Sequence, residues 1–464
     1  MRIIKYTLYV ISVLATGAQG AEMNPKTLLP KWDFLKPEQQ ELLWSQLEEI
    51  DLQELERQRA VILQQETSLD ALSVFEQYQE NGNPEDLENG KKIVQDGKVG
   101  CLIVAGGQGS RLSYTKPKGL YPVTVVQNKC LFQLFAEKIL AAGAQVGRPL
   151  YVAIMTSPEN HEETTLCFRE NSYFGLSQDQ LFFFSQTDLP LLDKKGNLFL
   201  ESEDRISRGP DGNASSLKQF VSSGIWDIWH KKGISYLNYM HIDNPLADPF
   251  DAELSGFHSR NPSSDVIVKC ISRQNPQEKL GVLFEQKGKV VVVEYSEIST
   301  DAREERKKDG SLKNNCANIG LYSFRMDFIQ EVATAHYDKL PFHKAWKSVK
   351  YLLEDGTSRK SEQPIAWKFE KFIFDVLPFA LNVKALLYPR EECFAPLKNA
   401  EGDDSLFFVQ AALQKRDRAI FEKISGTQPP KTRFELNPAF YYPTPELLKK
   451  WQGQSLPETP YVLP

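Results

Sequence analysis

From about residue 99 onward, short apolar runs alternate with longer amphipathic stretches, and this alternation restricts the possible folds more than any other feature of the chain. The runs Cys101–Ala105, Leu150–Met155 and Leu181–Phe184 contain no charged residue, and Ile234–Ile242 leads directly into Asp243. Strands of a parallel sheet are covered by helices on both faces, so they are apolar along their whole length. The pattern therefore predicts an α/β fold whose central sheet is mostly parallel, with helices on both faces.

Two further runs predict a hairpin within this region. Val282–Glu285 and Val290–Glu294 are mostly apolar and flank the pair Lys287-Gly288. Two such runs on either side of a short glycine-containing turn are typical of adjacent antiparallel strands. The predicted sheet is therefore mixed, with parallel pairing in the majority.

Changes in composition and in the pattern of apolar residues divide the chain into four predicted segments. Residues 1–22 are either a leader-like segment or an extension upstream of the true start, and residues 23–95 form a helical N-terminal segment. The α/β domain spans 96–403, and a small C-terminal domain spans 404–464. The helical segment is predicted because leucine and isoleucine recur at helical spacing. Proline also suits a first helical position. The residues that carry this pattern are Pro37, Leu43, Leu47, Ile50 and Leu55.

Composition excludes several classes of protein. Hydrophobic residues make up 41% of the 464 residues, which is enough for a sizeable core and excludes wholesale disorder. The formal net charge is −6, whereas a protein that neutralises many nucleic-acid phosphates carries a basic excess. Six cysteines are widely spaced with no C-x-x-C pair, which predicts isolated buried thiols in a reducing compartment. The six histidines are scattered too, so zinc is not expected, and His241 is expected to be a packing residue.

The most informative stretch runs from Val104 to Leu112 and continues with Lys116-Pro117-Lys118-Gly119. Its glycines follow a predicted buried strand, where they let the backbone bend sharply and approach a ligand closely. Consecutive backbone N–H groups in such a loop form a concave anion site. Arg111 and Lys118 add positive charge of two different shapes, a planar fork and a point charge, which suit different phosphates of one polyphosphate.

Two familiar phosphate-binding loops do not fit this stretch. A P-loop ends in Gly-Lys-Ser/Thr, whereas Gly109 is followed by Ser110-Arg111. The dinucleotide fingerprint needs a third glycine where this chain has Leu112. A dinucleotide-dependent oxidoreductase therefore rests on a partial glycine pattern alone.

The loop resembles the signature of the eukaryotic-type UDP-sugar pyrophosphorylases, and most of all their UDP-N-acetylglucosamine pyrophosphorylase branch. The signature is a strand, a glycine-rich turn and then Pro-Lys a few residues later. Ser110 stands where the family usually has Thr and keeps the hydroxyl, whereas Ser113 stands where it usually has Gly. The resemblance covers residues 35–405, and includes the segments Phe183–Gln186, Pro210–Asn213, His241–Asn244, Glu294–Glu297, Asn315–Ile319, Glu370–Asp375 and Phe394–Asn399. After Asn213 the family usually has Gly, where this chain has Ala214.

The resemblance implies a Rossmann-like nucleotidyltransferase sheet and a reaction in which UTP and a sugar 1-phosphate give a UDP-sugar and pyrophosphate. The catalytic residues it implies are Arg111, Lys118 and Lys398. The nucleotide-binding residues it implies are Ala105, Gly106, Gly107, Gly109, Gln186, Gly212, Asn213 and Asp243. The sugar-binding residues it implies are Gly281, Glu294, Asn318 and Phe372.

Electrostatic repulsion is the main obstacle to that reaction, because a dianion must approach a tetra-anion. The nucleophile is already an anion near neutral pH, so positioning and cations carry catalysis and no general base is needed. The implied cofactor is Mg²⁺, and Asp243 at a strand end is the expected metal ligand. A second metal-binding carboxylate is not evident.

Alternatives remain open at the level of the sequence. The favoured sugar is N-acetylglucosamine 1-phosphate, with a UDP-glucose or UDP-galactose type as runner-up. Ser113, Ala214 and the leader favour a second hypothesis, a catalytically inactive UDP-sugar-binding paralogue. The expected partners are the two substrates, with no nucleic acid and no membrane, and the expected assembly is a monomer or weak homo-oligomer.

The first twenty-two residues conflict with a cytoplasmic protein. Arg2 and Lys5 precede the apolar stretch 6–15, and Ala18-Gln19-Gly20 resembles a cleavage site for secretion. Either the protein is exported, or translation starts at Met23. Because UTP is a cytosolic metabolite, the second reading and a cytoplasmic location are favoured.

Overall fold

The computed structural model describes residues 24–464 apart from 31, 65–71 and 354. The leader-like segment 1–22 lies outside the described residues. Contacts divide the chain into two compact units. The larger comprises 66–188, 210–343 and 370–464, and the smaller comprises the chain up to 65 together with 189–209 and 344–369. The predicted boundaries at 95/96 and 403/404 rest only on changes in sequence composition and pattern, and they stay predictions.

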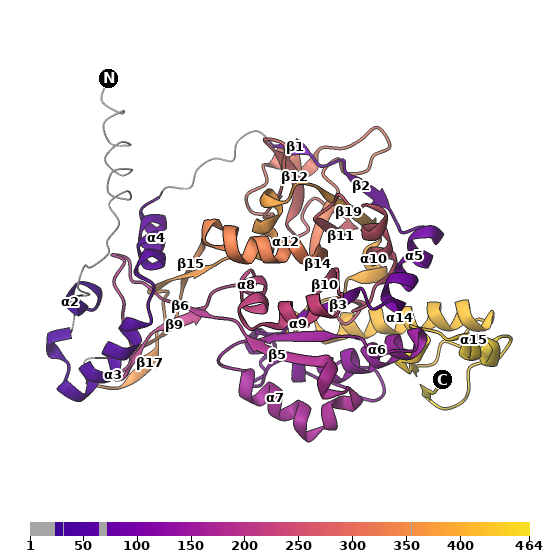
Figure 1. Ribbon diagram of the computed structural model, residues 1–464, viewed down its shortest axis with the longest axis horizontal. Coiled ribbons are helices and arrows are strands. Elements are labelled where there is room, and N and C mark those ends of the chain that lie inside the picture. The colour runs from indigo at the N-terminus through magenta and orange to yellow at the C-terminus, as the bar shows by residue number, and fades with distance from the viewer. Residues whose placement is uncertain (1–23, 31, 65–71, 354) are drawn as a thin grey trace. The chain divides into compact units, whose positions relative to one another are not determined.

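A mixed, mostly parallel sheet forms the centre of the larger unit (Figure 1). Its main path has the order β2-β19-β11-β14-β10-β3-β4-β5. β14 is antiparallel to both β10 and β11, while the other pairs along the path are parallel. The strands are β2 (Tyr78–Glu80), β3 (Val99–Val104), β4 (Val152–Thr156), β5 (Leu181–Ser185), β10 (Tyr236–His241), β11 (Val266–Ser272), β14 (Cys316–Arg325) and β19 (Val383–Tyr388).

The predicted hairpin joins this sheet at the side. β12 (Val282–Gln286) and β13 (Lys289–Val293) pair antiparallel, and the turn between them has positive φ at Lys287 and Gly288. β12 also pairs with β14 through Val282 and Ala317, and with the short strand β1 (Ser73–Val74). The prediction of a hairpin and of a mixed sheet is therefore confirmed.

Successive residues of each strand point to opposite faces of the sheet. Because the side chains on both faces are apolar, helices cover both faces. Cys101 and Ile103 of β3 belong to one hydrophobic core with residues of α6 (Leu131–Val146), α10 (Ala252–Arg260) and α14 (Leu406–Ser425). Leu102 and Val104 belong to a second core. That core includes residues of α8 (Ser215–Ser222), α9 (Ile225–Lys231) and α12 (Met326–Glu331). α5 (Pro84–Gln95) packs against α10.

The smaller unit carries the predicted N-terminal helices. α3 begins at Pro37 and runs to Glu48, and α4 spans Leu52–Leu63. Their buried apolar residues include Leu43, Leu47 and Leu55, as the spacing predicts. The unit also contains α2 (Pro25–Leu28) and the strands β7 (Leu200–Ser202), β8 (Arg205–Ile206), β16 (Lys350–Leu352) and β17 (Ser358–Lys360).

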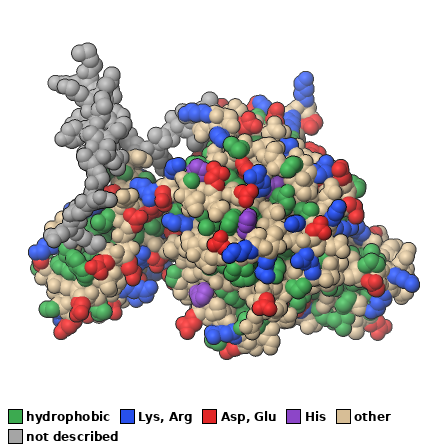
Figure 2. All heavy atoms as spheres, in the orientation of Figure 1, with side chains coloured by type: hydrophobic (Ala, Val, Ile, Leu, Met, Phe, Trp, Pro, Cys, Tyr) green, Lys and Arg blue, Asp and Glu red, His purple; other side chains and the backbone are tan. Residues whose placement is uncertain are grey.

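The C-terminal residues add a small core of their own to the larger unit. Phe421 of α14 packs with Phe434, Phe440 and Trp451, the last residue of α15 (Pro445–Trp451). The six cysteines form no disulfide, and Cys130 and Cys167 are half-buried while the other four are buried. Acidic and basic side chains are interspersed over the face seen in Figure 2.

Candidate active site

The glycine-rich loop leaves β3 at its carboxyl end and lies against the predicted uracil-binding glutamine. Ala105 is buried, and its carbonyl oxygen accepts a 3.1 Å hydrogen bond from the Asn160 side chain. A Cβ at Gly106 would lie 3.0 Å from Nε2 of Gln186, so glycine is needed for this close approach. Gln186 directly follows β5, and its side-chain amide forms no hydrogen bond with any described residue. The amide is therefore available to a ligand beside the loop.

The outer part of the loop folds back on itself. Gln108 and Pro117 form an isolated β-bridge, and the backbone N–H of Lys118 donates to the carbonyl oxygen of Gly107 at 3.2 Å. A Cβ at Gly109 would lie 2.8 Å from that of Tyr114. Arg111, in the 3-10 turn Ser110–Leu112, is exposed and forms no ion pair within the described chain.

Lys118 links the glycine-rich loop to the strand-end aspartate. Its Nζ lies 3.5 Å from Oδ2 of Asp243 and donates at 3.3 Å to the carbonyl oxygen of Leu397. Asp243 lies two residues beyond the end of β10, which is parallel to β3 and next to it. Lys398 follows Leu397, so three segments that are far apart in the sequence meet at this point. Three of the four predicted catalytic and metal residues, Lys118, Lys398 and Asp243, are therefore brought together, and the fourth is Arg111.

Asn244 holds the third segment in place. The backbone N–H of Leu397 donates to the carbonyl oxygen of Asp243 at 2.7 Å. The Asn244 side chain donates to the Cys393 carbonyl at 2.8 Å and accepts from the Ala395 N–H at 3.1 Å. Asn244 is almost completely buried, and no role for it is predicted from the sequence. Its position after a strand-end aspartate was the available signal, but its partners are about 150 residues away.

The charges around Asp243 favour its ionised form. Burial alone would raise the pKa of this carboxyl, but the cations Lys118 and Lys398, together with His241, outweigh burial and hold it below its ordinary value. Burial lowers the pKa of His241 itself, consistent with a packing residue. The Asp243 side chain keeps 20% of its surface exposed. The edge therefore presents one ionised carboxylate between two lysines.

A divalent cation would find a single protein carboxylate here. No group of three or more His, Cys, Asp or Glu side chains suited to a metal occurs among the described residues. Mg²⁺ is commonly held by one or two carboxylates together with substrate phosphates and water, rather than by an all-protein cage. Asp243 fits that type of site, in which the nucleotide supplies the remaining ligands.

The Gly212-Asn213 segment packs tightly against residues 371–373. Gly212 has φ +97°, and a Cβ there would lie 2.3 Å from the Lys371 carbonyl oxygen, so glycine is required twice over. The side-chain oxygen Oδ1 of Asn213 accepts a 2.8 Å hydrogen bond from the backbone N–H of Ile373. This bond fixes the segment, and the amide nitrogen of Asn213 donates to none of the residues that the structure describes.

The two departures from the family pattern have different consequences. Ala214 has φ −66°, within the ordinary right-handed region, so its Cβ fits without strain. Ser113 has φ +53° and ψ +34°, a left-handed conformation that glycine adopts far more readily. The methyl group at 214 is accommodated, while the serine at 113 carries a local backbone cost.

The residues predicted to bind the sugar also come together. The Asn318 N–H donates to the Gly281 carbonyl oxygen at 2.9 Å, and a Cβ at Gly281 would lie 3.4 Å from Oε1 of Glu294. Oδ1 of Asn318 accepts from the Tyr322 hydroxyl at 2.8 Å. Burial and the neighbouring Glu297 raise the pKa of Glu294, while Lys398 is among the cations that oppose the rise. Lys398 therefore acts electrostatically on both Asp243 and Glu294.

Phe372 is held by Asp375 and His343, neither of which is predicted from the sequence to be a site residue. Its backbone N–H donates to Oδ2 of Asp375 at 3.2 Å, at the start of the 3-10 turn Ile373–Phe379. Nε2 of His343 lies 2.8 Å from the same oxygen, and its ring centroid lies 4.7 Å from that of Phe372. Because the histidines are scattered in the sequence, nothing there marks His343 as different from the others.

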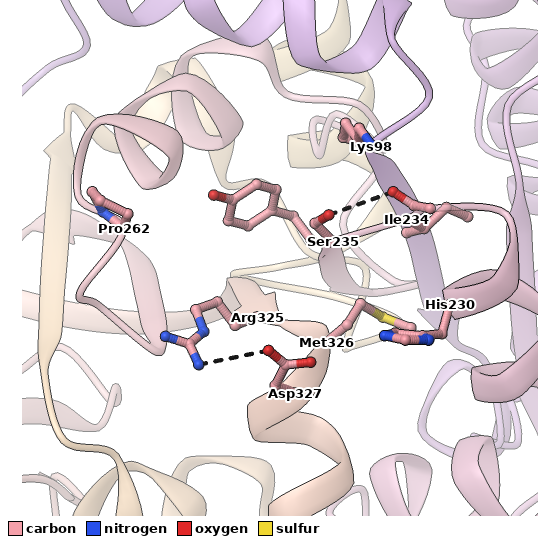
Figure 3. A pocket seen from close by; sticks show the side chains of 10 residues that line it. Lys98, His230, Ile234, Ser235, Pro262, Arg325, Met326 and Asp327 are labelled. Carbon is pink, nitrogen blue, oxygen red and sulfur yellow. Dashed lines mark hydrogen bonds and ion pairs between the residues drawn. The ribbon is translucent and has the colours of Figure 1, made fainter.

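A separate cavity lies at the opposite edge of the sheet (Figure 3). Its volume is about 340 Å³, and Lys98, Tyr236 and Arg325 are among its lining residues. Lys98 precedes β3 and Tyr236 begins β10, so the cavity lies at the amino ends of strands whose carboxyl ends carry the glycine-rich loop and Asp243. It contains none of the predicted site residues.

Comparison with known proteins places this arrangement in a family. The chain is 36% identical over 327 residues to a probable UDP-N-acetylglucosamine pyrophosphorylase of Dictyostelium discoideum, covering 68% of this chain and 67% of the relative. It is 32% identical over 397 residues to UDP-N-acetylglucosamine diphosphorylase 2 of Arabidopsis thaliana, covering 80% and 77%.

A solved structure of a putative UDP-N-acetylglucosamine pyrophosphorylase from Entamoeba histolytica superimposes with a TM-score of 0.73 at 26% identity, covering 82% of this chain and 96% of that one. The Trypanosoma brucei uridine diphosphate N-acetylglucosamine pyrophosphorylase, solved with an inhibitor, gives 0.70 at 27% identity, covering 79% and 77%. The family model described as UTP–glucose-1-phosphate uridylyltransferase matches residues 40–440. That range includes every residue of the candidate site, and the chain therefore belongs to the UTP–glucose-1-phosphate uridylyltransferase family.

Proposed function

We propose that this protein transfers the uridylyl group of UTP to a sugar 1-phosphate, releasing pyrophosphate, and that N-acetylglucosamine 1-phosphate is its preferred sugar substrate. The observation that carries the proposal is the meeting of Lys118, Asp243 and the Leu397-Lys398 segment beside the glycine-rich loop. Ligands of open α/β sheets bind outside the carboxyl ends of the strands, where these residues lie. The relatives' names support the choice of sugar.

The proposed reaction is an in-line displacement at the α-phosphorus of UTP. An oxygen of the sugar phosphate forms the new bond to phosphorus, and the bond between the α-phosphorus and the bridging oxygen to the β-phosphate breaks. The bonding electrons leave with pyrophosphate, so no proton has to be removed from the nucleophile. Catalysis then depends on holding the two anions in line and on offsetting their mutual repulsion.

Each cation has a place in this scheme. Arg111 and Lys118 bind the triphosphate and the departing pyrophosphate, and Lys398 binds the phosphate of the sugar. Mg²⁺, held by Asp243 and the nucleotide, would supply further positive charge to the phosphates. Because Lys118 also contacts Asp243, a bound nucleotide would compete for its ammonium group.

Recognition of the two substrates is assigned to two different groups of residues. Gln186 and the backbone near Gly212 bind uracil, because a site built to hydrogen-bond one base rejects bases that lack the same pattern. Gly281, Glu294, Asn318 and Phe372 bind the sugar. Glu294 and Asn318 supply hydrogen-bonding groups, and Phe372 supplies an apolar wall.

The proposal is tested with purified protein, Mg²⁺, UTP and a panel of sugar 1-phosphates. Release of pyrophosphate fastest with N-acetylglucosamine 1-phosphate supports it. Faster release with glucose or galactose 1-phosphate would keep uridylyl transfer and replace the sugar. If no sugar releases pyrophosphate while UDP-N-acetylglucosamine still binds, the protein is the inactive paralogue. Omitting Mg²⁺ with a chelator tests the metal, and activity should fall to background.

A cytoplasmic location is part of the proposal, because UTP is available there. Within the described chain, the structure contains no helix with the length and apolar character needed to cross a bilayer. Sequencing the N-terminus of the protein purified from its natural source tests the location. A start at Met23 agrees with the proposal, whereas a mature end created by cleavage near Gly20 contradicts it.

A further inference from the structure

We propose that His343, held by Asp375, is a positioning residue of the sugar pocket, which fixes the ring of Phe372 and offsets the negative charge that Glu294 and Glu297 present to an incoming sugar phosphate. This inference rests on the proposed function and assigns to it a residue that does not itself contact the reacting atoms. It is carried by three contacts of His343 and by the charges that surround it.

The contacts form one connected unit around Asp375. Oδ2 of Asp375 is shared between Nε2 of His343 at 2.8 Å and the backbone N–H of Phe372 at 3.2 Å. The imidazole lies against the rings of Phe372 and Phe374, with centroid separations of 4.7 and 5.7 Å. One carboxylate therefore orients the histidine and the backbone of the phenylalanine together, so movement of one is transmitted to the other.

The same unit continues to the uridine side. The residue after Phe372 is Ile373, whose backbone N–H donates to Oδ1 of Asn213 at 2.8 Å. The chain from His343 through Asp375 to Phe372 and Ile373 therefore ends on the segment that we assign to the nucleotide. Because Gly212 and Lys371 pack against each other over the same stretch, the uridine end is fixed independently. Loss of His343 should consequently loosen the sugar end first.

The charged groups that contribute most to the pKa of His343 are carboxylates. Asp375, Glu294 and Glu297 are the groups that act on it, and they come from two different segments. Burial alone would lower the pKa of His343, but its bond to Asp375 and these carboxylates outweigh burial and raise the pKa above its ordinary value. The protonated form of the imidazole is therefore favoured relative to an unperturbed histidine, and it lies beside the carboxylate of Asp375. Together with Lys398, His343 opposes the rise in the pKa of Glu294, so its charge adds to that of Lys398 near the sugar-binding residues.

The expected consequence is a selective loss of affinity for the sugar. In His343→Gln a side-chain amide can still donate to Asp375, but the charge and the ring are gone. We expect the KM for the sugar 1-phosphate to rise about tenfold, with the KM for UTP and kcat each within about threefold of the parent value, because the lost interaction acts on binding rather than on the transition state alone.

A matched control is available in His336. It also pairs with a carboxylate, Glu331, at 3.0 Å, but its ring stacks on Phe379 instead of Phe372. His336→Gln removes the same chemical group from a similar pair and should leave both KM values unchanged. Unfolding midpoints of the two variants within a few degrees of the parent show that the comparison is between folded proteins.

The pH dependence gives a readout that a purely structural role would not move. As pH rises through the raised pKa of His343, its charge is lost, so the KM of the parent protein for the sugar 1-phosphate should increase on the alkaline side. His343→Gln should lack that increase, and His336→Gln should retain it. This measurement on the parent protein needs no variant and stands if His343→Gln fails to fold.

The outcomes are distinct. Equal changes in both KM values, no change in either, or no alkaline rise in the parent protein overturns the role of His343 while leaving uridylyl transfer intact. Absence of pyrophosphate release by the parent protein with every sugar 1-phosphate overturns the proposed function, and this inference with it.

Discussion

The ammonium group of Lys118 lies 3.5 Å from the carboxylate of Asp243, although 125 residues separate them in the sequence. The pair joins a glycine-rich loop to the end of a neighbouring parallel strand, and its two side chains keep 12% and 20% of their surface exposed. In a largely buried ion pair the cost of desolvating both charges offsets much of their attraction, so the pair is weak evidence for a role in stability. Its position at the ligand-binding edge of the sheet therefore points to chemistry rather than to folding.

Lys118→Ala should abolish uridylyl transfer without unfolding the protein. Removing one preorganised positive group from a charge-stabilised transition state typically lowers kcat by about 10²–10³. Lys116→Ala is the control, because Lys116 is exposed and lies two residues earlier in the same loop. Pyrophosphate release and the thermal unfolding midpoint are the measurements. Full turnover by Lys118→Ala would remove this lysine from the site.

Asn244→Ala should slow uridylyl transfer, because it disturbs the lysine assigned to the phosphate of the sugar. The substitution removes the two hydrogen bonds that tie residues 393–395 to the strand-end aspartate, so Lys398 loses its fixed position. We expect kcat to fall by about 10- to 100-fold, since small displacements of a positioning group cost about that much. Asn399→Ala breaks a 2.7 Å bond to the Asp403 carbonyl in the same segment and should have little effect. Similar activity in both variants would show that the Asn244 bonds are dispensable.

Ser113→Gly should stabilise the protein slightly and leave turnover intact. A left-handed backbone costs a non-glycine residue about 1–2 kcal/mol, of which the added freedom of glycine in the unfolded chain returns part. The expected gain is about 0.5 kcal/mol, measured by denaturant unfolding. Ala214→Gly, at an ordinary φ, should give no gain. A loss of stability on Ser113→Gly would mean that the serine side chain makes a compensating interaction.

Lys138 should make the free energy of unfolding depend on pH. Burial, with Arg416 as the next contribution, lowers its pKa to about 7, and its Nζ donates to the Pro245 and Ala247 carbonyl oxygens at 2.7 and 2.9 Å. Between about pH 7 and 10 the unfolded chain binds a proton at this residue that the folded chain does not, so stability rises with pH across that window.

The difference between the parent protein and Lys138→Met isolates this contribution. The variant should be less stable by about 1–3 kcal/mol at alkaline pH, because two buried carbonyl groups lose their donor. The difference should shrink towards pH 7, because Lys138 binds a proton in the unfolded parent and this lowers the stability of the parent across the window. A difference in unfolding free energy that is flat from pH 7 to 10 would mean that Lys138 titrates normally.

The sequence predicts the layers of this fold well because each apolar run is short and bounded by turns. β3, β4, β5 and the β12–β13 hairpin lie where the runs place them, and α3 begins at Pro37. Periodicity reports only what each segment buries. It does not show that residues 189–209 and 344–369 join the N-terminal helices in a second compact unit.

Some residues of the candidate site can likewise be predicted from the sequence, and others cannot. The glycine-rich loop and Asp243 can be found from local chemistry, since bent glycines, cations and a strand-end carboxylate are informative by themselves. Asn244, His343 and Asp375 cannot be found in that way, because their roles depend on partners in distant segments. A histidine among three carboxylates is ordinary in the sequence and distinctive only once the chain is folded.

The most direct test of the account follows the two ends of UTP separately. With Mg²⁺ and N-acetylglucosamine 1-phosphate, label in the α-phosphate of UTP should appear in the UDP-sugar, and label in the γ-phosphate should appear in pyrophosphate, in equal amounts. If the α-label stays in UTP with every sugar 1-phosphate supplied, the meeting of Lys118, Asp243 and Lys398 does not serve uridylyl transfer.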